Sequence, residues 1–421
     1  MRAHTRTVSN RQSVVVVGFG FGGLSFVRSL RKHISSRSSG NYDIIVISKD
    51  DVITFTPLLP LVSEGKLRTG SMTESISDMA DRLGFKFVHS PARKIDLQNR
   101  RVITDGDEIR FDHLIIATGS TENYYGIPGA RQNSLPLRRV RDARIIQSEK
   151  DGLVASCCDS PDTQFSGNAS FVIVGGGLSG VETAMSLKNA LRVEGGNSCR
   201  FRDNGICIIE AAERLVPKEP EIVSEEVEKY LVYSGIRVMT KTKVSSIDHG
   251  NVALTDGTTI RAEEVIWTAG IRSNATELEI PDSVIDDRSG RIVVDHFLRI
   301  PGLREVYAIG DCALAKDRLG SPLQQNASVA VQEGRYLGKQ LAFLLRHGTI
   351  KKTRFDFRYF GHVLMLGNEN LFISPGNGVI RGGLGRMIAF IVPMLDLFSW
   401  KNRESLIMDK VRVVAHRRDA T

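Results

Sequence analysis

The stretch FVIVGGGLSGVETA, at residues 171–184, runs from a short apolar segment through a glycine-rich turn into a segment that suits a helix. Its glycines, Gly175, Gly177 and Gly180, follow the spacing G-x-G-x-x-G. In a strand–turn–helix unit, the first such glycine permits the tight turn, the second lets a pyrophosphate touch the backbone, and the third lets helix and strand pack closely. The stretch therefore predicts a dinucleotide-binding βαβ unit.

The strand expected to complete this unit, GICIIE at residues 205–210, ends in Glu210. An acid at the end of that strand accepts hydrogen bonds from the ribose hydroxyls of NAD and repels the additional phosphate of NADP. Glu210 therefore predicts a preference for NADH over NADPH.

A second turn of the same design lies in SVVVVGFGFGGLSF, at residues 13–26, where Gly18, Gly20 and Gly23 repeat the spacing. The N-terminus of the following helix offers backbone N–H groups and a partial positive charge to phosphates. The next strand, YDIIVIS, ends at Ser48 in place of the usual acid, and the Ser48 hydroxyl is able to bond a ribose. Two such turns in one chain predict two dinucleotides. We interpret them as a relay in which a tightly bound FAD takes a hydride from NADH.

Two further strands end in residues that suit a flavin. FDHLIIATGS, at residues 111–120, and REVYAIGDCA, at residues 304–313, both read as buried strands that end in a glycine-containing turn. The second turn contains Asp311, whose carboxylate can accept a hydrogen bond from the ribityl chain of a flavin. The stretch VIWTAGIRSN, at residues 265–274, repeats the first pattern in the second half of the chain.

The composition is that of a folded protein with two or three domains, because 421 residues exceed one hydrophobic core. The net charge of +8 fits an anionic ligand or an acidic membrane surface. The basic residues are spread along the chain without a nucleic-acid-binding motif, so we expect no nucleic-acid partner. The five cysteines and nine histidines have no metal-ligand spacing, which predicts no metal site and a reducing compartment.

The motifs GFGFGG, FTPLLP, ATGS, VGGGLSGVE, WTAGIR and AIGDCA occur in this order between about residues 13 and 340. Together they resemble the type II NADH:quinone oxidoreductases of the two-dinucleotide-binding flavoprotein superfamily. FTPLLP, at residues 55–60, and the preceding VISKDD favour the type II branch. The resemblance implies an α/β fold with two Rossmann-like domains. An FAD-binding domain at 1–145 and 284–340 is split by an NADH-binding domain at 146–283, and a C-terminal domain at 341–421 follows.

The resemblance also implies roles for individual residues. Two are implied in catalysis: Glu182, beside the nicotinamide and the flavin, and Gln332, between the flavin and the quinone. The family has a second glutamine four residues before Gln332, where this chain has Ser328. The residues implied in binding FAD or NADH are Gly18, Gly20, Gly22, Gly23, Ser48, Lys49, Thr56, Pro57, Leu58, Ala92, Ala117, Thr118, Gly119, Asp311, Ala327, Ser328, Gly175, Gly177, Leu178, Ser179, Gly180, Glu210 and Gly270.

The segment MIAFIVPMLDLFSWKNR, at residues 387–403, is apolar on one side and is flanked by basic residues. This composition is typical of an anchor that lies in a membrane surface, and equally of a helix packed on the protein's own core or on a homodimer partner. The segment is too short to cross a bilayer. The resemblance favours the membrane, and it implies a peripheral protein at the cytoplasmic face of the cell membrane or at an organelle inner membrane.

The implied reaction passes a hydride from NADH to FAD and two electrons onward to a membrane quinone, without proton pumping. A dithiol reductase of this architecture would need a cysteine pair in FTPLLPLVSEG, which has none. A sulfide:quinone reductase would need a late cysteine, and none follows Cys312. A ferredoxin or rubredoxin reductase, which would lack the membrane segment, stays open. So does a flavin redox sensor, which would be reduced by NADH without rapid turnover.

Overall fold

The computed structural model describes residues 11–34, 42–159, 169–194, 205–366, 369–373 and 379–380, together with Glu404 and Met408. Contacts within the chain divide it into two compact units, each made of separate stretches of sequence. The first unit lies within residues 1–53, 75–121 and 271–358, and the second within residues 54–74, 122–270 and 359–421.

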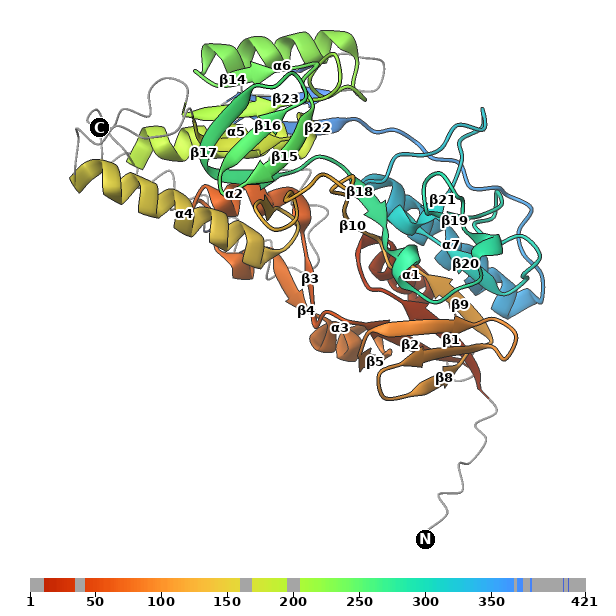
Figure 1. Cartoon of the computed structure of the whole chain (residues 1–421). Helices are drawn as coiled ribbons and strands as arrows, with labels where there is room; N and C mark the ends of the chain where they lie inside the picture. Colours follow the sequence, from red (N-terminus) through yellow and green to blue (C-terminus); the bar gives the residue numbers. More distant parts are fainter. Residues whose placement is uncertain are drawn as a thin grey trace. The chain divides into compact units, whose positions relative to one another are not determined.

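The first unit contains a five-stranded parallel sheet with the strand order β20-β9-β1-β2-β5 (Figure 1). Its central strand, β1, is completely buried over four consecutive valines, as expected of a parallel strand covered on both faces. The five strands are β1 (Gln12–Val17), β2 (Tyr42–Ser48), β5 (Lys86–His89), β9 (His113–Ile116) and β20 (Val306–Ala308).

Helices α1 (Phe21–His33) and α7 (Ala327–His347) pack tightly against each other in this unit. The close approach depends on two glycines of α7. A Cβ on Gly334 would lie 2.8 Å from the Phe26 nitrogen, and one on Gly338 would lie 2.7 Å from the Phe26 oxygen. The Ser29 hydroxyl of α1 also donates a hydrogen bond of 2.7 Å to the backbone oxygen of Arg335.

Shorter elements complete the first unit. An antiparallel sheet consists of β6 (Ala92–Asp96), β7 (Arg101–Thr104) and β8 (Glu108–Arg110). Two pairs of short strands are β10 (Ser120–Glu122) with β18 (Ile271–Ser273), and β19 (Ile292–Val293) with β21 (Ala313–Leu314). Strand β3 (Val52–Thr54) pairs with β4 (Thr73–Ser75), and the division of the sequence into two units falls within both of these strands. The helical segments are α3 (Ile76–Leu83), η4 (Asn274–Glu277), η5 (Asp282–Val284) and η6 (Gly310–Cys312).

The second unit contains a larger sheet in which β14, β13, β12 and β17 are parallel neighbours and β17, β16 and β15 are antiparallel neighbours. Its strands are β11 (Leu135–Pro136), β12 (Ala169–Val174), β13 (Ile206–Ile209), β14 (Arg237–Met239), β15 (Val244–Asp248), β16 (Asn251–Leu254) and β17 (Thr259–Trp267). A separate antiparallel sheet contains β22 (His362–Leu366), β23 (Glu369–Ile373) and β24 (Val379–Ile380).

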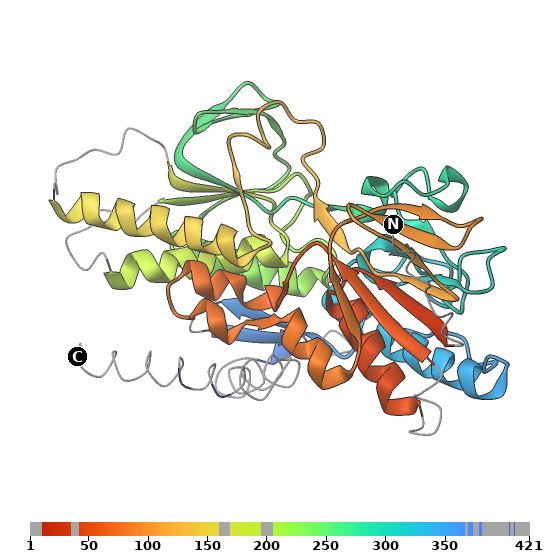
Figure 2. The same ribbon diagram turned by 90° about the horizontal axis from the view of Figure 1, so that it is seen from below.

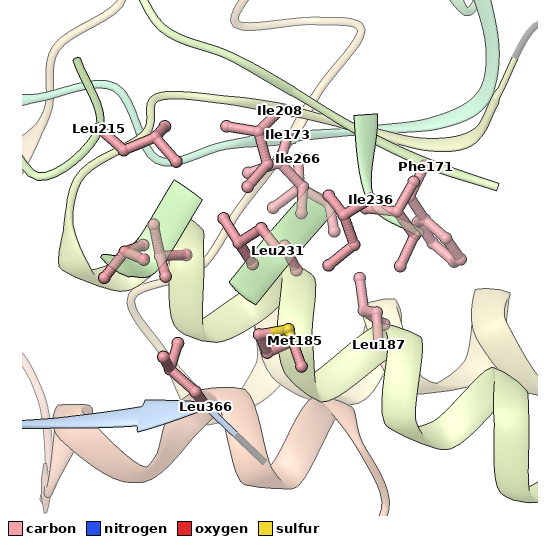
Figure 3. Close-up of a cluster of buried hydrophobic side chains, with 14 of the residues drawn as sticks. Phe171, Ile173, Met185, Leu187, Ile208, Leu215, Leu231, Ile236, Ile266 and Leu366 are labelled. Carbon is pink, nitrogen blue, oxygen red and sulfur yellow. The ribbon is translucent and has the colours of Figure 1, made fainter. Parts of the chain in front are cut away.

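Helices α4 (Val140–Asp159) and α5 (Leu178–Glu194) lie side by side in the second unit (Figure 2). The remaining helical segments there are η2 (Thr56–Leu58), α2 (Leu59–Ser63), η3 (Thr69–Ser71) and α6 (Glu221–Tyr233). Figure 3 shows the core, where side chains of β12, β13 and β17 meet those of α5 and α6, with Leu366 of β22 at one edge.

The predicted α/β class is confirmed. The strands and helices around both glycine turns form where the sequence predicts them, although α1 and α5 begin about three residues earlier than expected. Residues 54–74 group with the second unit and residues 341–358 with the first, whereas the predicted boundaries put them in the FAD-binding and C-terminal domains. The assignment of a cofactor to each domain remains a prediction.

The predicted membrane-associating segment at 387–403 lies outside the described residues. Within the part of the chain that the structure describes, no helix combines the length and the apolar character needed to cross a membrane.

Candidate functional site

The first glycine turn connects β1 to α1 and lies against the end of β9. Gly18 has a φ of +93°, and a Cβ there would collide with the Ala117 carbonyl. A Cβ on Gly23 would lie 2.5 Å from the carbonyl oxygen of Gly18. Gly18 and Gly23 are therefore required by the fold itself, because any other residue would force the strand, turn and helix apart.

The second glycine turn, between β12 and α5, repeats this arrangement. Gly175 has a φ of +110°, and a Cβ there would lie 2.6 Å from the backbone nitrogen of Ala269. A Cβ on Gly180 would collide with the carbonyl oxygen of Gly175. The two outer glycines of this turn are thus also fixed by packing.

The middle glycine of each turn has no such requirement. A Cβ on Gly20 or on Gly177 would meet no protein atom within 4 Å. Gly20 has no side-chain cap on α1, so the helix presents backbone N–H groups at this end. Open space before a glycine at a helix N-terminus fits a pyrophosphate pressed against the backbone. Both turns therefore fit the phosphates of FAD and NADH.

Glu210 follows β13 and lies beside the second turn. Its carboxylate accepts hydrogen bonds from the backbone N–H of Gly176, at 2.6 Å, and from that of Ala212, at 2.8 Å. These bonds fix the acid against the glycine-rich turn, where a ribose would need its acceptor.

Residues predicted to bind a flavin follow three strands of the first unit. The Ser48 hydroxyl, at the end of β2, accepts the backbone N–H of Asp50 at 3.2 Å. Asp311, in η6 after β20, accepts the Ser120 hydroxyl at 2.6 Å, and its backbone oxygen accepts the Gln325 amide at 2.9 Å. Thr118 follows β9, and its backbone oxygen accepts the Asn274 amide at 2.9 Å. The parallel sheet thus brings these chain segments to its carboxyl edge, where α/β proteins bind ligands.

Glu182 lies in the second turn of α5 and is only 9% exposed. Its Oε1 accepts the backbone N–H of Met365 in β22 at 2.9 Å. Burial raises the pKa of Glu182 to about 8, against an ordinary value of 4.5, and the Met365 bond offsets only part of this effect. The side chain is therefore mainly a neutral acid at pH 7.

Gln332 is bound to the backbone of a neighbouring segment. Its Nε2 donates to the Arg358 oxygen at 2.8 Å, and its Oε1 accepts the Arg358 N–H at 3.0 Å. The Ser328 hydroxyl, one turn earlier on α7, lies 3.5 Å from the same Nε2. Both polar atoms of the predicted quinone-side amide are thus hydrogen-bonded to the Arg358 backbone, a contact that the sequence does not predict.

The other predicted site residues are distributed over several elements. Gly22 is in α1, Lys49 follows β2, Ala92 begins β6, and Ala327 begins α7. Leu178 and Ser179 form the start of α5. Gly270 has a φ of +86°, and a Cβ there would collide with the hydroxyl of Tyr125. Thr56, Pro57 and Leu58 form η2, which groups with the second unit, whereas the predicted flavin residues named above group with the first.

Sequence reasoning missed Glu333. This residue is completely buried, and its Oε2 accepts the backbone N–H of Gly310. The signal that would have found it is helical periodicity. Glu333 falls on the same stripe of α7 as the buried residues Ala330, Leu337 and Leu341, so an acid occupies an apolar position.

Comparison with known proteins identifies a family whose match includes both glycine turns. The sequence profile of the family described as pyridine nucleotide-disulphide oxidoreductase matches residues 12–334. The chain belongs to this family. The match covers both glycine turns, η6 and the N-terminal part of α7.

Individual relatives confirm the resemblance to the type II enzymes. A probable NADH dehydrogenase of Dictyostelium discoideum is 26% identical over 98% of this chain and 91% of its own length. An Arabidopsis thaliana protein, external alternative NAD(P)H-ubiquinone oxidoreductase B2, mitochondrial, is 27% identical over 75% of this chain. The match spans 56% of that longer relative. The structure of NDH2 from Plasmodium falciparum in complex with NADH shares the fold, with a TM-score of 0.83 at 19% identity over 96% of this chain and 98% of that one.

Proposed function

We propose that this chain is a type II NADH dehydrogenase, which passes a hydride from NADH to bound FAD and then two electrons to a membrane quinone. The observation that carries the proposal is the pair of glycine turns. The middle glycines of these turns, Gly20 and Gly177, have open space where a Cβ would lie, so packing against the protein does not require glycine there. When bound, FAD supplies the chemistry that accepts a hydride and releases electrons. The protein supplies binding, orientation and charge.

Each turn has its own nucleotide in this proposal. The Gly18–Gly23 turn and Asp311 hold FAD, with the Ser48 hydroxyl taking the place of the usual acid at the ribose. The Gly175–Gly180 turn holds NADH. Glu210, already fixed by the Gly176 N–H, accepts the ribose hydroxyls and repels an additional phosphate.

Glu182 holds a proton beside the nicotinamide in this proposal. The Met365 N–H occupies Oε1, so Oε2 is the oxygen that carries the proton. A neutral acid adds no negative charge beside the bound nicotinamide nucleotide, and it donates a hydrogen bond where a carboxylate would only accept one.

A quinone is the proposed acceptor because relatives of this chain are named ubiquinone oxidoreductases. Membrane attachment through residues 387–403 is supported by their sequence, in which an apolar face is flanked by basic residues. Several relatives are named mitochondrial, which favours peripheral attachment to an organelle inner membrane over the cell membrane. A homodimer formed through the same segment is the competing arrangement.

Two thiols, those of Cys207 and Cys312, do not suit disulfide chemistry. Cys207 and Cys312 are free and buried, and they lie in different units. Burial raises the pKa of the Cys207 thiol to about 11 and also raises that of Cys312. Thiols of this kind are unreactive near pH 7, so these two do not supply the reactive pair that a disulfide reductase needs.

The acceptor is tested by reducing the FAD-loaded protein with NADH without oxygen and mixing it with alternative oxidants in parallel. We expect ubiquinone analogues to reoxidise the protein within its turnover time, and ferredoxin, a disulfide substrate and oxygen to do so much more slowly. Faster reoxidation by ferredoxin or by the disulfide would overturn the quinone assignment. Slow reoxidation by every oxidant would instead identify a redox sensor.

A further inference from the structure

Glu333 is the least expected ionisable residue of the first unit. It lies in the second turn of α7 and has 0% exposure. Its Oε2 accepts the Gly310 N–H, whereas its Oε1 is buried and has no hydrogen-bond partner among the described residues. A buried carboxylate normally has partners for both oxygens. An oxygen without one is the expected place for a proton.

The backbone that Glu333 holds is the turn of the predicted flavin site. Gly310 begins η6 with a φ of +75°, and Asp311 follows it directly. Asp311 is held in turn by the Ser120 hydroxyl and by the Gln325 amide. Glu333 is therefore a third support of the turn, and it contacts the backbone immediately before the predicted ribityl ligand.

The charged surroundings of Glu333 are simple. Arg291 is buried, and it donates from Nε to the Ala313 oxygen at 2.8 Å and from another nitrogen to the Leu323 oxygen at 3.1 Å. Its positive charge favours ionised Glu333, whereas the negative charge of Asp311 disfavours it. The neighbouring Cys312 thiol is buried and neutral, because burial raises its pKa. The residues of α1 nearest to Gly334, the neighbour of Glu333 on α7, are Gly22, Ser25 and Phe26, and none of them carries a charge.

We propose that Glu333 is a positioning residue that couples pH to the flavin. As a neutral acid it holds the Gly310–Asp311 turn in the FAD-binding conformation. When it ionises, its proton goes to bulk solvent and a second negative charge appears beside Asp311. That charge weakens FAD binding and disfavours the electron-rich, reduced flavin. The inference rests on the proposed FAD site, but it does not depend on the identity of the electron acceptor.

The pKa of Glu333 sets the range in which this coupling operates. Burial raises it to about 8, the Gly310 bond and Arg291 lower it, and Asp311 raises it further. Glu333 is therefore neutral at pH 7 and ionises in mildly alkaline solution. FAD binding and the flavin reduction potential are expected to be nearly insensitive to Glu333 below that range and to fall above it.

The test compares wild type with Glu333→Gln by measuring FAD affinity and the flavin reduction potential between about pH 6 and pH 10. Glutamine keeps an acceptor for the Gly310 N–H but cannot ionise. We expect the wild type to lose FAD affinity above pH 8. For each unit by which bound FAD raises the pKa of Glu333, the affinity should fall by up to about tenfold. In Glu333→Gln this additional loss, and the matching fall in potential, should be absent. Glu305→Gln removes a surface carboxylate of the same unit and should behave as wild type.

Identical pH profiles for wild type and Glu333→Gln would overturn the coupling. Glu333→Ala separates the support of the turn from the charge, since it also removes the acceptor for Gly310. We expect it to bind FAD more weakly than Glu333→Gln at every pH, and equal affinities would contradict the positioning role. Failure of the wild type to bind FAD at all would refute the proposed function itself, which distinguishes the two outcomes.

Discussion

At the scale of single residues, the nucleotide assignment depends on Gly20 and Gly177. A Cβ at either position would lie more than 4 Å from every protein atom outside its chain neighbours, so packing gives no reason to exclude alanine there. Their partners Gly18 and Gly175 differ, because a side chain there would collide with backbone atoms and would strain a positive φ. Within the two strand–turn–helix units, this contrast separates the glycines needed by the fold from the glycines that we assign to a ligand.

Replacing Gly177 with Val should strongly reduce NADH oxidation at low NADH concentration and leave FAD bound. The added side chain occupies the space of the pyrophosphate, and losing those contacts should weaken NADH binding by on the order of 100-fold, about 3 kcal/mol. NADH affinity is measured by calorimetry and FAD content by absorbance. Gly152→Val, at an exposed position of α4, is the control and should bind NADH normally. Unchanged NADH affinity in Gly177→Val would refute the assignment of this turn.

Replacing Glu210 with Ala should raise the KM for NADH about tenfold, since a hydrogen bond to a charged group contributes about 1.5–3 kcal/mol. It should also reduce the rejection of NADPH, because the acid that repels the additional phosphate is gone. Steady-state kinetics with both nucleotides provide the measurement. An unaltered ratio of kcat/KM for NADH and NADPH would count against Glu210 as the selective residue.

Glu182 should make the folded protein less stable as pH rises. The unfolded chain releases this proton near 4.5, whereas the folded chain keeps it up to about 8. Between these values the native state binds more protons, so the free energy of unfolding falls with pH by up to about 1.4 kcal/mol per pH unit from this group. Glu182→Gln keeps an acceptor for Met365 and should flatten the urea-unfolding profile between about pH 5 and pH 8. An equally steep profile in the variant would disprove the buried neutral acid.

At the scale of elements, both strand–turn–helix units were predictable because their pattern is local. Apolar runs predicted the buried strands, and glycine spacing predicted the turns. Helices α1 and α5 begin earlier than expected because residues of the turns themselves, Gly22 and Gly23 or Leu178 to Gly180, enter the first helical turn. The contact between Gln332 and Arg358 was not predictable. Helical periodicity shows that Gln332 lies on a polar face of α7, but not which segment of the chain packs on that face.

Three side chains of α7, spaced four residues apart, form hydrogen bonds with the backbone of residues 351–358. Tyr336 donates its hydroxyl to the Thr353 oxygen, and Gln340 bonds both that oxygen and the Lys351 N–H. Gln332 continues the same row at Arg358. Gln332, to which the resemblance assigns a role in quinone binding, therefore also has a structural contact within the first unit.

Replacing Gln332 with Ala should expose the Arg358 amide to exchange. Loss of a hydrogen bond of about 1 kcal/mol corresponds to exchange about five times faster. Hydrogen exchange read by NMR or mass spectrometry measures this change. Gln340→Ala is the matched control and should affect the Lys351 amide while leaving Arg358 protected. If Arg358 exchange is unchanged and only the KM for quinone rises, Gln332 acts as a quinone ligand and not as a support.

At the scale of the whole molecule, the sequence indicated two cofactor domains but not which segments group by contact. Residues 54–74 lie between two stretches of the first unit, yet α2 packs with α4 and α5 of the second. Residues 359–366 return to the second unit, where Leu364 and Leu366 join its core. Such groupings come from long-range packing of apolar side chains, which a local pattern does not encode.

Membrane attachment through residues 387–403 is a property of the whole molecule that truncation can test. Truncation after residue 385 removes the apolar segment at 387–403 and should release the protein from anionic liposomes, because both the apolar face and its basic flanks are lost. Co-sedimentation with liposomes at low and high salt provides the measurement. Persistent binding of the truncated chain would favour a segment that packs on the protein or on a second copy.

The central claim is that two nucleotide sites in one chain allow NADH to reduce a bound flavin. The most direct measurement is the absorbance of the flavin in purified, FAD-loaded protein, titrated with NADH without oxygen. We expect the oxidised flavin band to bleach with about one NADH per flavin, since a hydride carries two electrons. A protein that stays colourless after incubation with FAD, or a flavin band that persists under excess NADH, would contradict it.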